Sequence, residues 1–296
     1  LPFTSGNMVY VVLNFLFLVR NRQGIFHVTG HDHYAALALP RNRTILTIHD
    51  LIFLRSYKGW KKILLRWLLL ELPVKRCLYI TTVSEQTKDE ILSLVKCDPS
   101  KILVIPNPVR FTEIPSRQNS VLEHPVLLFI GTHPHKNLQY VIASIVGMKV
   151  HLRIVGRLKQ TEKELLEKFD VNFSNKQDLT DDDMQHEYTD ADMLIFPSRY
   201  EGFGLPVIEA FQHGLPVITS NIAPMSQVAG DAACLVDPDS IVSIRQAIFS
   251  LIQNPLQCDA LRAKGYIRVR DFQIDKISQL YKELYDSVAA AHAKLN

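Results

Sequence analysis

The sequence predicts an α/β protein with two doubly wound, Rossmann-like domains that face each other across a cleft. Strand-like apolar runs alternate with helix-like segments along the chain, as in parallel sheets covered by helices. Residues 111–125 are polar with two prolines and interrupt this alternation as a linker would. The 296 residues also exceed what one hydrophobic core usually serves. We therefore expect domains at 1–113 and 124–271, a linker at 114–123, and a last segment at 272–296.

The first half opens with the apolar run "MVYVVLNFLFLV", residues 8–19. It is too short to span a bilayer and is interpreted as a buried helix. A second apolar helix is expected to end near Pro73, and Ser84 is expected to cap the helix that follows it. Four strands are expected in residues 24–30, 43–53, 77–84 and 101–109.

In the second half the alternation restarts. Thr180 and Asp183 have the spacing of a capping box and predict a helix start. A last helix, roughly 273–290, has an apolar stripe at helical spacing, formed by Ile277, Leu280, Leu284 and Val288. Strands are expected in residues 126–132, 150–156, 192–198 and 215–220.

Charge divides the chain into a basic and an acidic part. Residues 1–113 carry a balance of +7 and the remainder −4, which gives the net charge of +3. In "GWKKILLRWLLLELP", Trp60, Ile63, Leu64, Trp67 and Leu70 share one side of a helix, and Lys62 and Arg66 lie together on another. Tryptophans beside basic residues favour a membrane interface. The alternative is that these tryptophans fill the N-terminal core.

The stretch "SRYEGFGLPVIEAFQHGLPVITSN", residues 198–221, carries the clearest chemical signal. It follows a strand, so it lies at the carboxyl end of a sheet, where such folds bind ligands. Gly204 permits a tight loop, and Pro206 suits a helix start, which places Glu209 in the first helical turn. Two carboxylates beside the free N–H groups of a helix start suit a sugar joined to a phosphate. The alternative is that Glu209 supports the helix and Glu201 is solvated.

Several segments in order resemble the GT4 family of glycosyltransferases. "EGFGLPVIE" is similar to its E-x7-E motif, and "LTIHDLIF", "TTVSEQTKDEI", "KILVIPNPV", "FIGTHPHKNL" and "VAGDAACLVDP" resemble other family segments. The resemblance runs from about His27 onward. It implies a GT-B fold, a nucleotide-sugar donor held mainly by the second domain, and retention of configuration without a metal or other cofactor. It also implies that the last helix crosses back to the first domain.

The resemblance assigns roles residue by residue. Glu201 corresponds to the glutamate that contacts the donor sugar at the reacting centre, and Glu209 to the one that binds ribose. Lys136 corresponds to the lysine on the diphosphate, where its charge stabilises the leaving group. His49 corresponds to a histidine near the donor sugar. The backbone of the loop that meets sugar and phosphates corresponds to Phe203, Gly204 and Leu205.

Three departures from the family pattern stand out. An arginine common near the diphosphate lysine is absent, since Thr132 and His135 occupy the comparable places. Gln227 stands where a glutamate is common. The family's first strand and glycine-rich loop are not found, so we expect the N-terminal domain to be incomplete.

The sequence therefore predicts a retaining glycosyltransferase of cell-surface polysaccharide or glycolipid synthesis. It would transfer a hexose-type sugar from a nucleotide-diphosphate sugar to a glycan or lipid-linked acceptor. The alternatives are a sugar-nucleotide-binding module without turnover and a sugar-nucleotide epimerase. A nucleotide-dependent oxidoreductase is disfavoured because no G-x-G-x-x-G string occurs.

The predicted setting is the cytoplasm, with peripheral contact on the anionic inner face of a membrane. The four cysteines have no paired spacing, which is typical of reduced thiols and of a chain without a zinc site. "HDH", residues 31–33, is interpreted as a loop rather than a metal site because no third ligand accompanies it. No nucleic-acid partner is expected.

Overall fold

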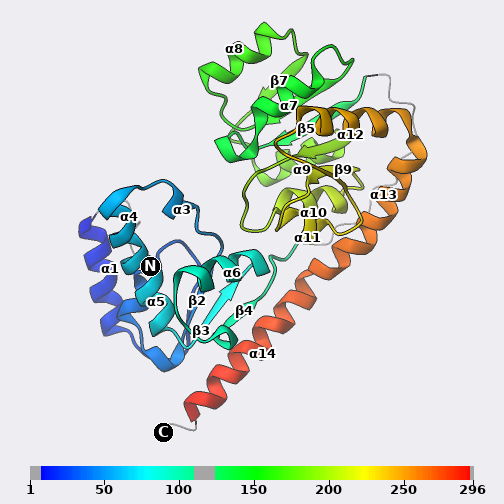
Figure 1. Ribbon diagram of the computed structural model, residues 1–296. Helices are drawn as coiled ribbons and strands as arrows, with labels where there is room; N and C mark the ends of the chain where they lie inside the picture. The colour runs from blue at the N-terminus through cyan, green and yellow to red at the C-terminus, as the bar shows by residue number, and fades with distance from the viewer. Residues whose placement is uncertain (1–7, 110–123, 294–296) are drawn as a thin grey trace. The chain divides into compact units, whose positions relative to one another are not determined.

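The computed structural model describes residues 8–109 and 124–293, so the expected linker at 114–123 lies outside the described residues. The chain forms two compact units. The N-terminal unit contains the residues up to Asn107 together with those from Asp275 onward, and the C-terminal unit runs from Pro108 to Ile274. Figure 1 shows the first unit in blue, cyan and, for its last helix, red, and the second from green to orange. Val109 belongs to the second unit because its N–H donates to the Phe272 carbonyl at 2.8 Å.

The N-terminal unit is built on a parallel sheet of four strands in the order β1-β2-β3-β4. All five residues of its inner strand β2 are buried, as a strand covered on both faces requires. The four predicted strands are therefore confirmed. They are β1 (Phe26–Val28), β2 (Thr44–Ile48), β3 (Tyr79–Thr82) and β4 (Ile102–Val104).

Short helices connect these strands. The predicted cap at Ser84 is confirmed, because its hydroxyl accepts the Thr87 backbone N–H at 3.2 Å. The helices are α1 (Met8–Arg20), α2 (Ala35–Ala38), α3 (Ile52–Arg55), α4 (Gly59–Arg66), α5 (Leu72–Arg76) and α6 (Glu85–Leu94), and the long α14 (Ile274–Ala293) joins them from the end of the chain.

The interpretation of residues 8–19 as a buried helix is wrong. They do form a helix, α1, but it packs against α2 and leaves most of its apolar side chains exposed. Its buried residue Asn14 is polar, and the amide donates to the Tyr34 hydroxyl at 3.3 Å. A helix that is apolar all round normally lies inside a core. The exposed side chains are Val9, Tyr10, Val12, Leu13, Phe15, Leu16, Phe17 and Val19.

The helix expected to end near Pro73 continues three residues further, to Arg76. A single π-helical turn, Trp67–Glu71, precedes the proline, and within it the Leu72 N–H donates to the Trp67 carbonyl. The missing N–H of Pro73 leaves the Leu69 carbonyl without its helical donor. The buried ring of His33 donates to that carbonyl from Nδ1 at 2.9 Å. "HDH" thus supplies a structural hydrogen bond to this helix.

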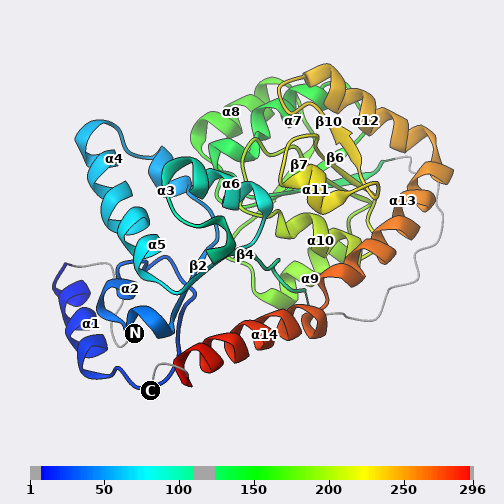
Figure 2. The ribbon, with the colours of Figure 1, turned by 60° about the horizontal axis from the view of Figure 1, so that its bottom comes forward.

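The same π-turn rotates the side chains that follow α4. Leu70 is fully buried, so it does not share the face of Trp60 and Trp67 as predicted. Those two side chains are 69% and 50% exposed. The alternative in which the tryptophans fill the core is therefore wrong. Figure 2 shows α4 and α1 as separate helices of this unit.

The C-terminal unit has a six-stranded parallel sheet in the order β10-β9-β8-β5-β6-β7. This is the Rossmann order, and it reverses between β5 and β8. The four predicted strands are confirmed. The two edge strands, β7 and β10, are short and were not predicted. The strands are β5 (Val126–Ile130), β6 (His151–Val155), β7 (Phe173–Lys176), β8 (Met193–Phe196), β9 (Val217–Ser220) and β10 (Cys234–Val236).

The helices of this unit complete a large apolar core around β5, β6 and β8. Helix α7 packs against α12, and α10 packs against α13. The capping box is confirmed, since Thr180 Oγ1 accepts the Asp183 N–H and the Asp183 carboxylate accepts the Thr180 N–H at 3.0 Å. The helices are α7 (Leu138–Ile145), α8 (Gln160–Lys168), α9 (Asp181–Thr189), α10 (Leu205–Gln212), α11 (Met225–Ala229), α12 (Ile241–Gln253) and α13 (Pro255–Arg268).

Helix α14 belongs to the N-terminal unit through its apolar stripe. Ile277, Leu284 and Val288 are buried in one cluster with Ile45 of β2 and Ile105. Leu280, expected in the same stripe, is 38% exposed. None of the helices in the described part of the chain has the length and apolar character needed to cross a membrane.

Candidate active site

Two loops of the C-terminal unit bring the predicted donor-site residues together. The loop after β5 carries Lys136, and the loop after β8 carries Glu201. The two strands are neighbours, and the strand order reverses between them. In doubly wound sheets the carboxyl ends of strands at such a point bind the ligand. The topology therefore explains why two residues 65 positions apart meet.

Hydrogen bonds fix the two loops to each other. The His135 carbonyl accepts the Arg199 N–H at 2.8 Å and the Ser198 hydroxyl at 3.0 Å. The buried amide of Asn137 donates to the Pro197 carbonyl at 3.2 Å and to the Pro238 carbonyl at 2.6 Å. Because Asn137 has a left-handed φ of 72°, which asparagine tolerates, the chain turns sharply after Lys136. The positions of Lys136 and Glu201 are thus set by backbone contacts on both sides.

Lys136 and Glu201 form an ion pair in this structure. Nζ lies 2.7 Å from Oε1, and the two side chains are 15% and 13% exposed. Nζ also lies 4.6 Å above the ring of Phe196, which further favours the cation there. A Cβ at Gly131 would lie 3.0 Å from Lys136 Cε, so the glycine leaves room for this side chain. Sequence reasoning gave these two residues separate roles and did not foresee the pair.

The rest of the predicted loop leads directly into α10. The side chain of Phe203 is buried and meets Phe272 edge-on, with ring centroids 5.5 Å apart. Gly204 has φ 102°, a conformation that favours glycine, and it precedes the first helical residue, Leu205. The helix ends at Gln212. Glu209 is the fifth helical residue, so its predicted place in the first turn is wrong and it lies in the second.

Glu209 lines a cavity of about 490 Å³ that lies within the C-terminal unit. Its Oε2 accepts the hydroxyl of Tyr188 at 2.5 Å. Burial raises the pKa of the Glu209 carboxyl, and the hydrogen bond from Tyr188 acts in the opposite direction. The other lining residues are Pro108, Val109, Asp181, Asp182, Met184, Gln185, Tyr188 and Gln212.

His213 joins Tyr188 and Glu209 into one array. Its ring stacks on that of Tyr188 with centroids 5.0 Å apart, and its Nδ1 lies 2.8 Å from the Glu209 carbonyl. Its Nε2 lies 2.7 Å from Oε1 of Gln185, a residue that also lines the cavity. Sequence reasoning missed Tyr188 and Gln185. The signal that would have found them is that Thr180 starts their helix, α9, directly after a strand.

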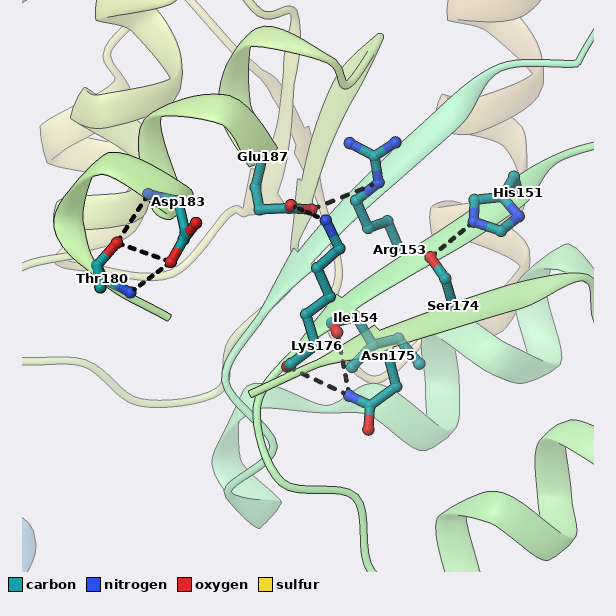
Figure 3. A network of polar contacts seen from close by, with 9 residues as sticks. All are labelled: His151, Arg153, Ile154, Ser174, Asn175, Lys176, Thr180, Asp183 and Glu187. Atoms are coloured by element: carbon teal, nitrogen blue, oxygen red, sulfur yellow. Dashed lines mark hydrogen bonds and ion pairs between the residues drawn. The ribbon is translucent and has the colours of Figure 1, made fainter. Parts of the chain in front are cut away.

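A buried carboxylate holds α9 against the sheet (Figure 3). Glu187 is almost fully buried, with Lys176 Nζ of β7 at 2.5 Å and Arg153 Nε of β6 at 3.5 Å. The Asn175 amide donates to the Ile154 carbonyl at 3.1 Å, which ties the ends of the same two strands. Lys176 is half exposed, but Glu187 is buried, so losing its cationic partners would leave a buried carboxylate unpaired, which is destabilising. Glu187 precedes Tyr188, so this network fixes the helix that carries the partner of Glu209.

His49 belongs to the N-terminal unit, where it follows β2. Its Nε2–H donates to the carbonyl of Thr29 at 2.9 Å. This bond fixes the tautomer, because a carbonyl accepts only from a protonated nitrogen. Within residues 8–109 and 124–293, no group of three or more His, Cys, Asp or Glu side chains is placed to hold a metal ion.

Comparisons with known proteins add to this geometry. Residues 124–254 match the family model described as "Glycosyl transferases group 1", and residues 7–113 match "Glycosyltransferase Family 4". O-antigen chain mannosyltransferase RfbU of Salmonella typhimurium is 33% identical over 255 residues, which cover 82% of this chain and 69% of that protein. O-antigen chain mannosyltransferase B of Escherichia coli is 26% identical over 274 residues, covering 84% and 70%.

Solved structures show the same fold at low identity. Sucrose-phosphate synthase from Thermosynechococcus elongatus has a TM-score of 0.80 at 17% identity, over 95% of this chain and 78% of that one. Anabaena HepE in complex with UDP and glucose has a TM-score of 0.78 at 13% identity, over 97% and 84%. The fold is GT-B, with two Rossmann-like units. The chain is a glycosyltransferase that belongs to glycosyltransferase family 4.

Proposed function

We propose that this glycosyltransferase transfers a hexose from a nucleotide-diphosphate sugar to a glycan or lipid-linked acceptor, with retention of configuration and without a metal ion. Mannose is the first candidate for the sugar, because the similar proteins of Salmonella typhimurium and Escherichia coli are named O-antigen chain mannosyltransferases. The product would then be a cell-surface polysaccharide or glycolipid. The observation that carries the proposal is the Lys136–Glu201 pair at the carboxyl ends of β5 and β8.

The pair suggests how donor binding proceeds. Lys136 and Glu201 are mostly buried, so each stabilises the other's charge while the site holds no donor. When the donor binds, the ion pair is replaced by two contacts with the donor. The ammonium of Lys136 binds the diphosphate, and a sugar hydroxyl donates to Glu201. Lys136 then stabilises charge on the leaving diphosphate as the bond to the sugar breaks. Glu209 accepts the ribose hydroxyls, and His49 acts near the donor sugar.

The test measures hydrolysis of isotope-labelled donors and nucleotide binding by two variants. Glu201→Ala should spare binding of the bare nucleoside diphosphate and lower turnover, because its partner is the sugar. Glu209→Ala should weaken nucleotide binding roughly ten- to a hundredfold, since charge-assisted hydrogen bonds contribute about 1.5–3 kcal/mol. Equal loss of nucleotide binding in both variants would contradict the division of roles.

A thermal-shift screen with UDP-, GDP- and ADP-sugars identifies the base and the sugar, since a ligand that binds the native state raises its stability. Product analysis then separates transfer from epimerisation. A protein that binds a donor but never turns it over would be a binding module, and the proposal would fall.

The exposed face of α4 supports peripheral contact with an anionic membrane in the cytoplasm. Trp60 and Trp67 lie outward beside Lys61, Lys62 and Arg66. Each basic residue near an anionic surface contributes about 1 kcal/mol, less as salt increases. Vesicle sedimentation should show binding that requires anionic lipid, weakens at high salt and falls when these three basic residues become Gln. Equal binding to neutral vesicles would contradict this docking.

A further inference from the structure

A second cavity, of about 450 Å³, lies within the N-terminal unit between α3, α4 and α6. Its volume is in the range of small-molecule sites. Basic side chains come from two of the three helices: Arg55 from α3, and Lys62 and Arg66 from α4. Its remaining lining residues are Leu51, Leu54, Ile63, Glu90, Ser93 and Leu94.

The charges of this cavity are incompletely balanced. Arg55 pairs with Glu90 at 3.3 Å, but the arginine side chain is 56% exposed, and exposed pairs of this kind contribute little. Arg66 pairs with Glu71 at 2.9 Å outside the lining, and its Nε is buried without a hydrogen-bond acceptor among the described residues. Against Glu90 and Glu71, the three cations keep one positive charge in excess, that of Lys62, so the cavity attracts an anion.

An exposed apolar stripe runs along the edge of the same cavity. Trp60, Ile63 and Leu64 of α4 recur at helical spacing with Trp67 of the π-helical turn that continues the helix, and all four are exposed. Ile63 is 65% exposed and also lines the cavity, so it belongs to both. Lys62 and Arg66, four positions apart, lie on the neighbouring face of the helix. A phosphate bound beside these two residues would therefore have apolar surface next to it.

We infer that this cavity binds the phosphorylated end of a lipid-linked acceptor, with its lipid chain lying along the apolar stripe of α4. The inference rests on the lipid-linked acceptor of the proposed function and names the place where that acceptor is held. The basic side chains donate to the phosphate oxygens, since guanidinium and ammonium groups form strong charge-assisted hydrogen bonds with phosphate. Glu90 lies in the same lining and weakens the attraction for any anion, so phosphate binding rests on the three basic side chains.

The protein contains two tryptophans, Trp60 on α4 and Trp67 at the start of the π-helical turn that follows it, so its tryptophan fluorescence reports on this helical segment alone. Titrations with farnesyl diphosphate below its micelle concentration, without divalent cations, should change this emission. Farnesol and inorganic diphosphate each carry half of the ligand and should bind at least tenfold more weakly. If either binds as tightly as farnesyl diphosphate, the cavity recognises a bare chain or a bare anion, and the inference falls. Equal binding of dihexanoylphosphatidylglycerol would mean that it recognises phospholipid headgroups generally, which also overturns it.

Two neighbouring lysines provide a matched test. Lys62 lines the cavity, whereas Lys61 lies on the opposite side of the apolar stripe and is absent from the lining. Lys62→Glu should weaken farnesyl diphosphate binding at least tenfold, and Lys61→Glu should change it less than twofold. Equal losses would mean that diffuse charge attracts the ligand, and no loss in either would mean that it binds elsewhere.

The same pair of variants separates this inference from membrane docking. Sedimentation with anionic vesicles should weaken to a similar extent in both lysine variants, because a surface field does not distinguish neighbouring charges. Vesicle sedimentation therefore tests membrane docking alone, and farnesyl diphosphate binding tests the cavity alone. Either hypothesis can be contradicted while the other is supported.

Discussion

Helices α4 and α10 are both eight residues long, but they differ in burial. Helix α4, "GWKKILLR", has no buried residue. Helix α10, "LPVIEAFQ", has five, and they pack between β8, β9 and α13. Both contain several large apolar side chains. The apolar content of a helix therefore indicates a face that needs to be covered. It does not indicate whether the same chain or another molecule covers it.

The comparison predicts that alanine substitutions on the two helices change the free energy of unfolding by very different amounts. Phe211 on α10 is 1% exposed and packs tightly on Gly265, where a Cβ would lie 2.9 Å from its ring. Phe211→Ala should lower the free energy of unfolding of the C-terminal unit by about 3–5 kcal/mol. Ile63→Ala on α4 should change stability by less than about 0.5 kcal/mol. Urea denaturation measures both, and a large loss at Ile63 would mean that α4 is covered by protein.

Helix α14 contains the same contrast within one element. Leu284 is buried with Ile45 and Ile105, whereas Leu280, one turn earlier, is 38% exposed. Leu284→Ala should lower the stability of the N-terminal unit by about 2–5 kcal/mol, and Leu280→Ala by less than about 1 kcal/mol. Amide hydrogen exchange in β2 would show which unit loses protection. Loss confined to the C-terminal unit would contradict the assignment of α14.

The smallest expected effect concerns the polar partner of α10. Tyr188→Phe removes the hydroxyl that donates to Glu209 and should weaken nucleoside diphosphate binding by about 0.5–1.5 kcal/mol, or two- to tenfold. In a Glu209→Ala background the same change should have no further effect. Calorimetric titration of all four proteins measures the coupling.

The pH dependence distinguishes this role from a purely structural one. The Tyr188 hydrogen bond favours the charged carboxylate, so its removal raises the pKa of Glu209 beyond the increase that burial already causes. As pH falls, the carboxylate is therefore protonated sooner, and nucleotide affinity should decline at a higher pH in Tyr188→Phe than in the parent protein. Identical pH profiles would show that the hydroxyl does not act through Glu209.

The alternation of strands and helices predicted the inner strands of both sheets. Runs such as Thr44–Ile48 and Val126–Ile130 are apolar because helices cover them on both faces. The edge strand Phe173–Lys176 was not predicted, because half of its side chains face water and its composition is mixed. Thr180 and Ser84 were predicted as caps because a cap depends on neighbours three residues away.

Several features that the sequence did not predict depend on distant partners. The helix was expected to end near Pro73, and it reaches Arg76 because a π-turn and the ring of His33 compensate for the missing N–H. The motif gave Glu201 and Lys136 as site residues, yet their ion pair follows from the strand order. Tyr188 was missed because a tyrosine near a helix end resembles an ordinary core residue, and because the strand before its helix, Phe173–Lys176, was not predicted.

The chain enters the C-terminal unit at Pro108 and returns to the N-terminal unit at Asp275. The N-terminal unit is therefore interrupted, and one of its apolar clusters lacks Ile277, Leu284 and Val288 until residues 275–288 have been made. At ribosomal rates of about 5–20 residues per second, the intervening unit takes roughly 8–30 s to emerge. During synthesis the C-terminal unit can thus finish folding before the N-terminal unit, although residues up to Asn107 are made before it.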